Sequence, residues 1–291
     1  MLLDTGWFAS IEDVVRSLRR AGYLADEATA TTVFLAGRLE KPLLVEGPAG
    51  TGKTDLARAV SDASKRRLVR LQCYEGLDES KVLYEWNYRK QLLWLQAERE
   101  RPGTTRDLED IFSEPFLLER PVLQAIRSQE PTVLLVDEID RIEMETEALL
   151  LEVLSDYQVT IPELGTIRSA TRPFTVLTSN ATRELSEALK RRCLYLWLDY
   201  PSIERERSIV MSRVPEASEV LADQIVRVVR SLRTMELKKA PSIAETLDWA
   251  RTLVELGKVE VDEEVVGQTA GTLLKHRADI EKAKAEGLAS R

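Results

Sequence analysis

The sequence predicts an α/β protein in which helices cover both faces of a parallel sheet and a region built only of helices follows. Short, almost uninterrupted apolar runs alternate with helical patterns up to Tyr200. Strands without polar alternation are typical of a parallel sheet that is buried on both faces. Beyond Tyr200 only helical patterns follow. We therefore expect two domains, residues 1–200 and 201–291, with a helical extension before the first strand.

Five apolar runs provide the predicted strands, at residues 42–47, 68–73, 132–138, 174–180 and 194–198. A helix is expected at 55–64, and the residues on either side of a turn at 162–165 predict a β-hairpin at about 157–168. In the second domain the predicted helices cover residues 203–213, 217–235, 242–256 and 262–284. Pro201 and Pro241 stand near predicted helix starts.

The composition is that of a soluble globular protein, with 44% apolar and 31% charged residues. A net charge of −8 gives no general electrostatic support for binding nucleic acid. Cys73 and Cys193 lack neighbours at metal-ligand spacing and His276 is the only histidine, so neither a disulfide framework nor a zinc site is expected. The N-terminus has no signal-peptide pattern and no apolar stretch reaches the ~18 residues of a membrane span, which favours the cytoplasm.

The strongest motif is GPAGTGKT, which lies between the first predicted strand and a helical pattern. A phosphate-binding P-loop, or Walker A motif, requires this context. Its backbone N–H groups surround phosphate oxygens, Lys53 reaches the β- and γ-phosphates of ATP, and the Thr54 hydroxyl is a ligand for Mg²⁺. The predicted nucleotide-binding residues are Gly47, Pro48, Ala49, Gly50, Thr51, Gly52, Lys53, Thr54 and Asp55.

An acidic pair ends the third apolar run, VLLVDE. Open α/β sheets bind their ligands at the carboxyl ends of strands. Asp137 is therefore predicted to hold Mg²⁺, and Glu138 to orient and deprotonate an attacking water. Such a pair is also common where a helix begins, so its functional meaning depends on the P-loop earlier in the chain.

A polar residue also ends the fourth apolar run, FTVLTSN. The Asn180 amide is suited to position a water beside the γ-phosphate without adding negative charge, and we predict it as a catalytic residue. The alternative is an ordinary turn or helix N-cap, a role that suits both Asn180 and Thr182.

Two adjacent arginines precede the fifth run, in ALKRRCLYLWLDYP. Arg191 and Arg192 follow a short predicted helix at 183–190. The simplest interpretation is a favourable interaction with the helix macrodipole, worth ~0.3–1 kcal/mol.

Taken together and in this order, the motifs resemble the core of an AAA+ ATPase, with Walker A, Walker B, a sensor-1 residue and an arginine finger. The stretch LEVLSDYQVTIPELGTIRSATRPFTVLTSN resembles the hairpin region of the MoxR branch. LQCYEGLDESKVLYEWNYRKQ, FLLERPVLQAI and LKRRCLYLWLDYP resemble CoxD-like members, which are associated with maturation of the molybdenum-copper carbon monoxide dehydrogenase. The resemblance covers about residues 41–201.

The resemblance implies a P-loop NTPase of AAA+ type that hydrolyses ATP with Mg²⁺ and assembles into a homo-oligomeric ring, usually of six subunits. In such a ring Arg192, with Arg191 as an assistant or as the partner of a carboxylate, enters the neighbouring subunit's site. The resemblance also implies a helical insert at about 75–120, a von Willebrand A-type partner protein and a metalloenzyme client. The sensor-2 arginine that the family often carries is replaced near Ser242, and Lys239 or Arg251 could substitute for it.

Two segments are open to two interpretations each. By resemblance, Tyr23 in AGYLAD is predicted to lie against the adenine, and Gly22 is equally suited to end a helix. The aromatic residues of segment 83–98 fall on more than one face of a helix, so this segment either packs in the core or offers a surface to a partner.

Three functions follow from these features. The favoured one is an AAA+ chaperone of MoxR type that acts on a client enzyme. The second is a nucleic-acid-directed AAA+ protein such as a helicase or clamp loader, which the negative net charge disfavours. The third is a small-molecule P-loop kinase, which has no need for Glu138, Asn180 and Arg192 together.

Overall fold

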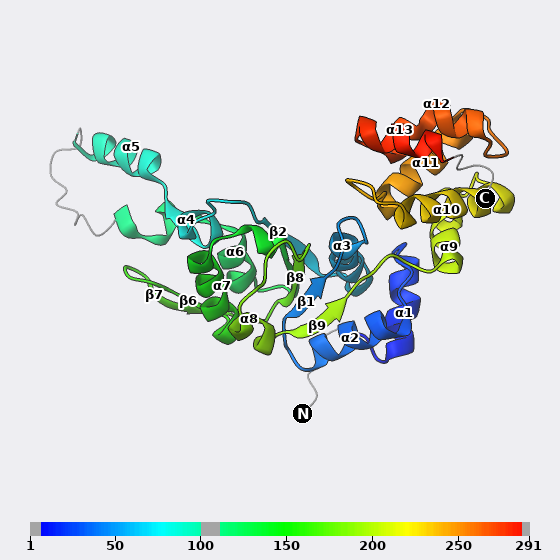
Figure 1. Ribbon diagram of the computed structural model, residues 1–291. Coiled ribbons are helices and arrows are strands. Elements are labelled where there is room, and N and C mark those ends of the chain that lie inside the picture. The colour runs from blue at the N-terminus through cyan, green and yellow to red at the C-terminus, as the bar shows by residue number, and fades with distance from the viewer. Residues whose placement is uncertain (1–6, 100–110, 287–291) are drawn as a thin grey trace. The chain divides into compact units, whose positions relative to one another are not determined.

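A computed structural model gives the fold of residues 7–99 and 111–286 (Figure 1). Residues 1–6, 100–110 and 287–291, which belong to the predicted N-terminal extension, insert and helical domain, lie outside the described residues. The chain forms two compact units, and each is described by itself. The first contains the described residues up to Ala21, Ala25–Glu46 and the described part of Thr54–Trp197; the second contains Gly22–Leu24, Gly47–Lys53 and the described residues from Leu198 onward.

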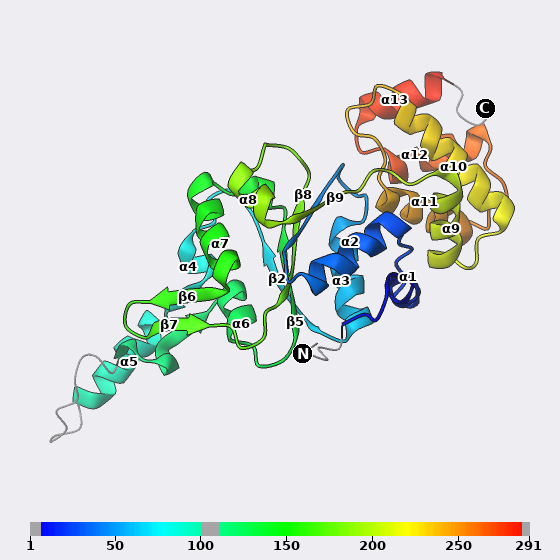
Figure 2. The same ribbon diagram turned by 90° about the horizontal axis from the view of Figure 1, so that it is seen from below.

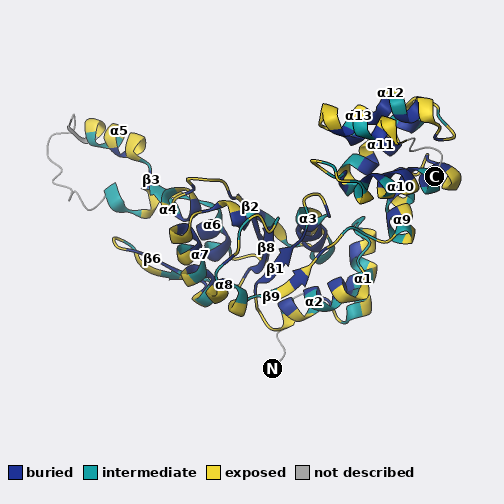
Figure 3. Ribbon diagram, in the orientation of Figure 1, coloured by how far each residue is buried: buried dark blue, intermediate teal, exposed yellow. Residues whose placement is uncertain are grey.

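Five parallel strands form the central sheet of the first unit, in the spatial order β2-β5-β8-β1-β9. They are β1 (Leu43–Glu46), β2 (Arg67–Gln72), β5 (Thr132–Asp137), β8 (Phe174–Ser179) and β9 (Leu194–Trp197). Every residue of β1, β5 and β8 is buried (Figure 3). This arrangement confirms the predicted parallel sheet. Because the strands run the same way, the residues that follow their carboxyl ends gather at one edge.

Helices cover both faces of this sheet, with α2 and α3 on one side and α6 and α7 on the other (Figures 1 and 2). The helices of the first unit are α1 (Ile11–Arg20), α2 (Glu27–Arg38), α3 (Lys53–Ser64), α4 (Glu79–Val82), α5 (Tyr88–Arg99), α6 (Pro121–Arg127), α7 (Met144–Asp156) and α8 (Glu187–Arg192), with 3₁₀ turns at Glu114–Phe116 and Ile139–Arg141.

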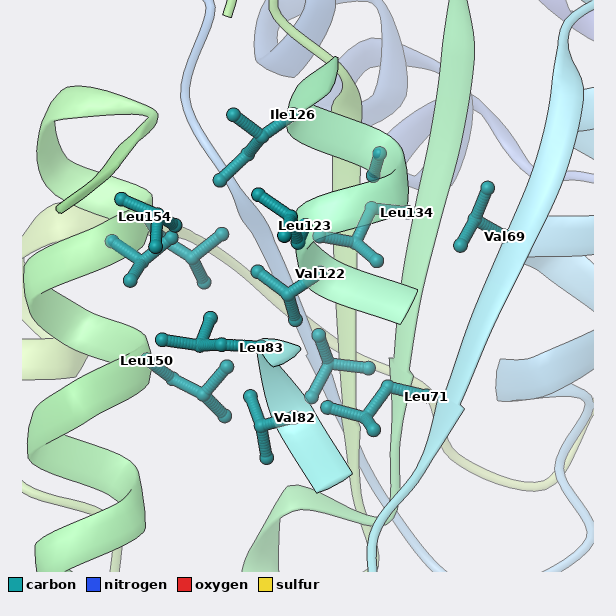
Figure 4. Close-up of a cluster of buried hydrophobic side chains, with 14 of the residues drawn as sticks. Val69, Leu71, Val82, Leu83, Val122, Leu123, Ile126, Leu134, Leu150 and Leu154 are labelled. Atoms are coloured by element: carbon teal, nitrogen blue, oxygen red, sulfur yellow. The ribbon is translucent and has the colours of Figure 1, made fainter. Parts of the chain in front are cut away.

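The apolar core of the first unit lies between the sheet and helices α6 and α7 (Figure 4). Proline at the first position of α6 suits a helix start, since no N–H is needed there. Leu123 on α6, Leu134 on β5 and Leu150 on α7 are all completely buried. Each such leucine contributes ~1.5–3 kcal/mol by leaving water. This packing holds the edge that bears Asp137.

The aromatic segment departs from the helical prediction because its first residues form a strand. β3 (Tyr84–Trp86) pairs in antiparallel fashion with β4 (Leu117–Glu119). Trp86 is buried in the core and its ring meets that of Phe112 edge to face, with centroids 5.4 Å apart. The helix α5 follows the strand and exposes Tyr88, Leu92 and Leu93. The strand therefore packs in the core, while the partner surface stays a prediction for the exposed part of α5.

A separate two-stranded hairpin follows α7. Its strands are β6 (Gln158–Ile161) and β7 (Gly165–Arg168), and they pair in antiparallel fashion. Gly165 has a φ of +81°, a conformation that glycine adopts at no steric cost. The turn exposes the Glu163 side chain.

The second unit is helical from Ile203 to its last described residues. Its helices are α9 (Ile203–Arg213), α10 (Glu219–Thr234), α11 (Ile243–Glu255), α12 (Glu263–Leu273) and α13 (Arg277–Ala285). Trp249 is completely buried in their core and donates a 2.7 Å hydrogen bond from Nε1 to Thr269.

Two details of this unit correct the sequence prediction. The single helix predicted at 262–284 is broken, because Leu274 is extended and buried between α12 and α13. In addition, Ser202 and Ser242 are the N-caps of α9 and α11, so the prolines before them lie outside the helices.

Candidate active site

The P-loop, Gly47–Lys53, belongs to the second unit. Gly50 and Gly52 have φ values of +73° and +92°, which disfavour any residue with a Cβ. Lys53, the first residue of α3, is buried, and its Nζ donates to the carbonyls of Gly47 at 2.9 Å and Pro48 at 2.7 Å. The Thr51 hydroxyl also donates to the Pro48 carbonyl, at 3.0 Å.

The outer residues of the predicted nucleotide site are accessible. Ala49 is exposed at the tip of the loop. Asp55 is exposed on α3 and lies 3.8 Å from Arg58. An ion pair this exposed contributes ~0–1 kcal/mol. Asp55 also lies in the first turn of α3, where a negative charge stabilises a helix.

Tyr23 lies against the P-loop. A Cβ placed on Gly52 would lie 3.6 Å from Cε2 of the Tyr23 ring. Its neighbour Gly22, just after the C-cap Ala21 of α1, has a φ of +79°. The Gly22 carbonyl accepts a 3.4 Å hydrogen bond from Arg213. The structure thus confirms that Gly22 follows a helix end, and contact of Tyr23 with adenine stays a prediction.

The N-terminus of α11 contacts the P-loop. The Ile243 N–H donates a 3.1 Å hydrogen bond to the Gly50 carbonyl. A Cβ on Gly50 would lie only 2.1 Å from the Cβ of Ser242, so this position requires glycine for space as well as for its φ. The two predicted substitutes for a sensor-2 arginine are engaged elsewhere, Lys239 with Glu245 at 3.1 Å and Arg251 with Asp248 at 3.2 Å.

The carboxylate group of the site lies in the first unit, around Asp137. Its Oδ1 accepts hydrogen bonds from the hydroxyls of Thr54 at 2.9 Å and Thr178 at 2.5 Å. Its Oδ2 accepts two from Arg70, at 3.1 Å from Nε and 2.6 Å from the terminal nitrogen. The last residue of Walker A thus contacts the first acid of Walker B.

Glu138 follows the strand in a left-handed conformation, with a φ of +60° and a ψ of +49°. Its N–H donates to the Thr178 hydroxyl at 2.9 Å. Its carboxylate meets Arg141 at 2.9 Å and accepts a 3.2 Å bond from the Gln72 amide. Left-handed backbone is uncommon for residues other than glycine and is enriched at functional sites.

Asn180 lies at the carboxyl end of β8, beside β5, and is half-buried. The next turn is fixed by Asp140, which accepts bonds from Thr182 N–H at 3.2 Å and its hydroxyl at 2.6 Å. Burial raises the pKa of Asp140, but hydrogen bonds from Thr182 and from the backbone of Asn180 and of Asp140 itself together hold the pKa of this carboxyl below its usual value. The backbone of Asn180 thus also hydrogen-bonds to Asp140.

The negative charge of this edge is visible in the thiol of Cys73. Burial, together with the charges of Asp137, Asp140 and Glu138, raises the pKa of Cys73 to about 12. The three acids therefore add to an effect that burial already has on this thiol.

Arg191 and Arg192 are the last two residues of α8, so they lie within the helix rather than after it. Both side chains are exposed, and Arg192 donates a 3.2 Å bond to the Ala188 carbonyl of its own helix. Neither forms an ion pair with another residue that the structure describes. The helix starts later than predicted because Ser186 is its N-cap, while Arg183 is held by Glu147 at 2.7 Å.

Sequence reasoning missed Arg70, Gln72 and Thr178, which touch the predicted site residues. Arg70 and Gln72 are two positions apart on β2 and therefore share one face of the strand. Thr178 lies within the same apolar run that led to Asn180. The signal available for all three was a polar residue near the carboxyl end of a strand next to β5.

Residues 42–193, just over half of the chain, match the AAA domain (dynein-related subfamily). The chain belongs to this AAA family. Its relatives include an uncharacterized protein of Staphylococcus haemolyticus, 27% identical over 80% of this chain and 82% of that protein. Another, from Staphylococcus epidermidis, is 28% identical over 75% of this chain and 78% of that protein.

Solved structures of RuvB from Thermotoga maritima are also similar. One structure of a mutant RuvB is 18% identical, covers 91% of this chain and 71% of that chain, and has a TM-score of 0.49. The Holliday junction branch migration motor from the same organism is 18% identical over 89% of this chain and 69% of that chain, with a TM-score of 0.46. No helix within residues 7–99 and 111–286 is both long and apolar enough to cross a membrane.

The residues fit the nucleotide and magnesium that an AAA domain typically binds. Lys53 supplies a positive charge, and Thr54 with Asp137 supplies hard oxygen ligands. Among the described residues no group of three or more His, Cys, Asp or Glu could hold a metal alone. Mg²⁺ usually binds through one or two protein groups plus phosphates.

Proposed function

We propose that this protein hydrolyses ATP to ADP and phosphate, using the two Walker motifs as one site. The observation that carries the proposal is the 2.9 Å hydrogen bond from Thr54 to Asp137. Thr54 is the last residue of the Walker A motif, so this bond links the two motifs within the first unit.

Each residue then has a role. The P-loop N–H groups and Lys53 bind the phosphates, and Thr54 with Asp137 holds Mg²⁺, which would neutralise charge on the phosphates. Glu138 orients and deprotonates the attacking water, a task for which its carboxylate reaches solvent, with 32% of the side chain exposed. Asn180 positions that water from the next strand.

We propose that the protein acts as a homo-oligomeric ring, with six subunits by resemblance. Arg192, assisted by Arg191, would stabilise charge in the neighbouring subunit's site, as trans arginines do in related phosphoryl-transfer enzymes. Both are exposed and free of ion pairs to the described residues, and edge strand β9, just after them, exposes Tyr195 (52%) and Trp197 (48%). An exposed aromatic edge beside two exposed cations suits a contact with a second copy.

The client-directed part of the proposal rests on resemblance to MoxR-type and CoxD-like proteins. We propose a cytoplasmic chaperone that assists maturation of a metalloenzyme, with a von Willebrand A-type partner and without nucleic acid. The net charge of −8 supports the last point, and two free cysteines fit a reducing compartment. The hairpin turn at Glu163 and the exposed apolar face of α5 are the surfaces proposed for the client.

The decisive experiment for hydrolysis is the Glu138→Gln variant. It should bind ATP as the wild type does and release phosphate at least ~100-fold more slowly, because the amide keeps the size but cannot take a proton. Glu143→Gln, an exposed neighbour, is the matched control and should retain full activity. Normal phosphate release by Glu138→Gln would remove this residue from the mechanism.

The ring proposal is tested by mixing two inactive variants. Arg192→Ala keeps an intact P-loop, and Lys53→Ala keeps an intact finger. A mixed ring contains some interfaces where both are intact, so ATPase activity should return on mixing. Finding none, although subunits exchange, would contradict a trans role for Arg192.

The client proposal has its own test. Replacing Glu163 and Leu164 with Gly-Ser should leave basal ATP hydrolysis unchanged and abolish activation of the client captured with the ATP-trapped Glu138→Gln protein. Loss of both activities in a folded protein would mean that the hairpin supports the nucleotide site instead.

A further inference from the structure

Arg70 forms an ion pair with Asp137, the predicted magnesium ligand. It lies on β2, which pairs with β5 in a register that sets Gln72 opposite Asp137. Both its Nε and a terminal nitrogen donate to the same oxygen, Oδ2 of Asp137, at 3.1 and 2.6 Å. The terminal nitrogen also donates to the Gln72 side chain. The guanidinium is thus held by two partners.

The contacts of Asp137 show that its buried negative charge is compensated mainly by Arg70. Oδ1 already accepts two hydroxyl hydrogen bonds, from Thr54 and Thr178. Only 2% of the Asp137 side chain is exposed, so water gives its charge little help. Arg70 is the only cationic group of the described residues that forms an ion pair with Asp137. Buried carboxylates are strongly unfavourable when their cation is removed.

We propose that Arg70 is the resident counter-ion of Asp137 and sets the affinity of the site for its divalent metal. This inference rests on the proposed ATPase function. A metal held by Thr54 and Asp137 must share the carboxylate with a permanent positive charge, because a guanidinium stays protonated at any physiological pH. Arg70 therefore weakens metal binding while it stabilises the metal-free protein.

The exposure of Arg70 is suited to this exchange. Its side chain is 42% exposed, against 2% for Asp137, so the guanidinium can turn toward water while the carboxylate stays in place. Arg141 offers a matched comparison, since it pairs at 2.9 Å with the adjacent acid, Glu138, and is not among the described residues that bond to Asp137. Comparing the loss of Arg70 with the loss of Arg141 therefore distinguishes a specific effect on Asp137 from a general change of charge.

The test is the binding of Mn²⁺ to the protein–ADP complex, followed by electron paramagnetic resonance at fixed pH and low salt. Arg70→Gln should bind Mn²⁺ about tenfold more tightly than the wild type, the scale expected for removing one half-exposed charge beside a metal ligand. Arg141→Gln should change the affinity by less than about threefold. Equal or weaker Mn²⁺ binding by Arg70→Gln would overturn the proposal.

Nucleotide binding without metal and refolding with metal are measured as well, to distinguish failure of this inference from failure of the ATPase proposal. Binding of a fluorescent ADP analogue in EDTA is measured first: no nucleotide binding by the wild type would overturn the ATPase proposal and this inference together. Bound nucleotide with unchanged Mn²⁺ affinity would overturn the inference alone. If Arg70→Gln does not fold without metal, it should refold with Mg²⁺ and ADP, and failure to refold would count against the proposal.

Discussion

The most quantitative prediction concerns a buried ion pair in the helical unit. Arg233 on α10 and Glu206 on α9 have side chains that are 9% and 2% exposed, and they form two hydrogen bonds of 2.6 and 2.8 Å. Arg233 also donates a 2.8 Å hydrogen bond from Nε to the Pro241 carbonyl, next to the residue that packs on Gly50. Its guanidinium lies 4.3 Å from the centroid of the Tyr200 ring.

Replacing Arg233 with methionine should lower the free energy of unfolding by about 3–5 kcal/mol. The change keeps the apolar stem but leaves the Glu206 carboxylate buried without its cation, and losses of this size are typical for one partner of a buried pair. The only remaining side-chain donor to Glu206 among the described residues would be the Thr246 hydroxyl, at 2.9 Å. Loss of the bond to Pro241 adds about 1 kcal/mol.

Denaturant unfolding followed by circular dichroism measures the effect, and α10 itself provides a control. Arg227 pairs with Asp223 at 2.8 Å on the same helix, but its side chain is 64% exposed, so Arg227→Met should change stability by less than about 1 kcal/mol. The double variant Arg233→Met with Glu206→Gln should recover at least about 2 kcal/mol, because no charge is then left buried.

Two results would refute this reasoning. One is a loss below about 1 kcal/mol for Arg233→Met, which would show that water reaches Glu206. The other is a double variant as unstable as the single one, since the penalty would then come from packing rather than from charge.

Three further predictions address the site. Gly50→Ala should weaken ATP binding at least about tenfold, measured by calorimetry, because its φ is +73° and Ser242 occupies the space of the new Cβ. Thr178→Val should destabilise the protein by about 1–3 kcal/mol and slow phosphate release, because Asp137 loses its 2.5 Å donor; normal kinetics would contradict the role given to this hydroxyl. Because the pKa of the Cys73 thiol is raised to about 12, this thiol should react with iodoacetamide at pH 9 at least about 100-fold more slowly in the native than in the unfolded protein. For the same reason its contribution to the free energy of unfolding should fall as the pH rises from 9 toward 12, where the thiol ionises in the unfolded protein first.

The sheet could be predicted because its strands carry their own signal. The strands β1, β5 and β8 are buried along their whole length, and the apolar residues that dominate β1 and β5 make these two recognisable without any knowledge of their neighbours. The signal of β8 is weaker, because Thr175, Thr178 and Ser179 are buried polar residues. The break at Leu274 could not be predicted, since no glycine or proline marks it. Leu273 and Leu274 are both buried, so the apolar pattern continues across the break.

Within the site, the motif residues could likewise be predicted from the sequence, whereas the contacts between distant residues could not. The residues of the two Walker motifs are evident from their composition and from their position after a strand. Arg70 is not, because its partner Asp137 lies 67 positions further along the chain and only the pairing of β2 with β5 brings them together. Likewise, Ser242 has the features of a helix cap, and nothing local indicates that it also abuts Gly50.

Because Trp249 is buried, its fluorescence can report on the core of the helical unit. The other four tryptophans, Trp7, Trp86, Trp94 and Trp197, all belong to the first unit. A variant with phenylalanine at those four positions would fluoresce from Trp249 alone, whose indole is completely buried and hydrogen-bonded to Thr269. Water entering that core would shift the emission to longer wavelengths. The rate at which water enters this core could then be measured in solution with each nucleotide in turn, without attaching a dye.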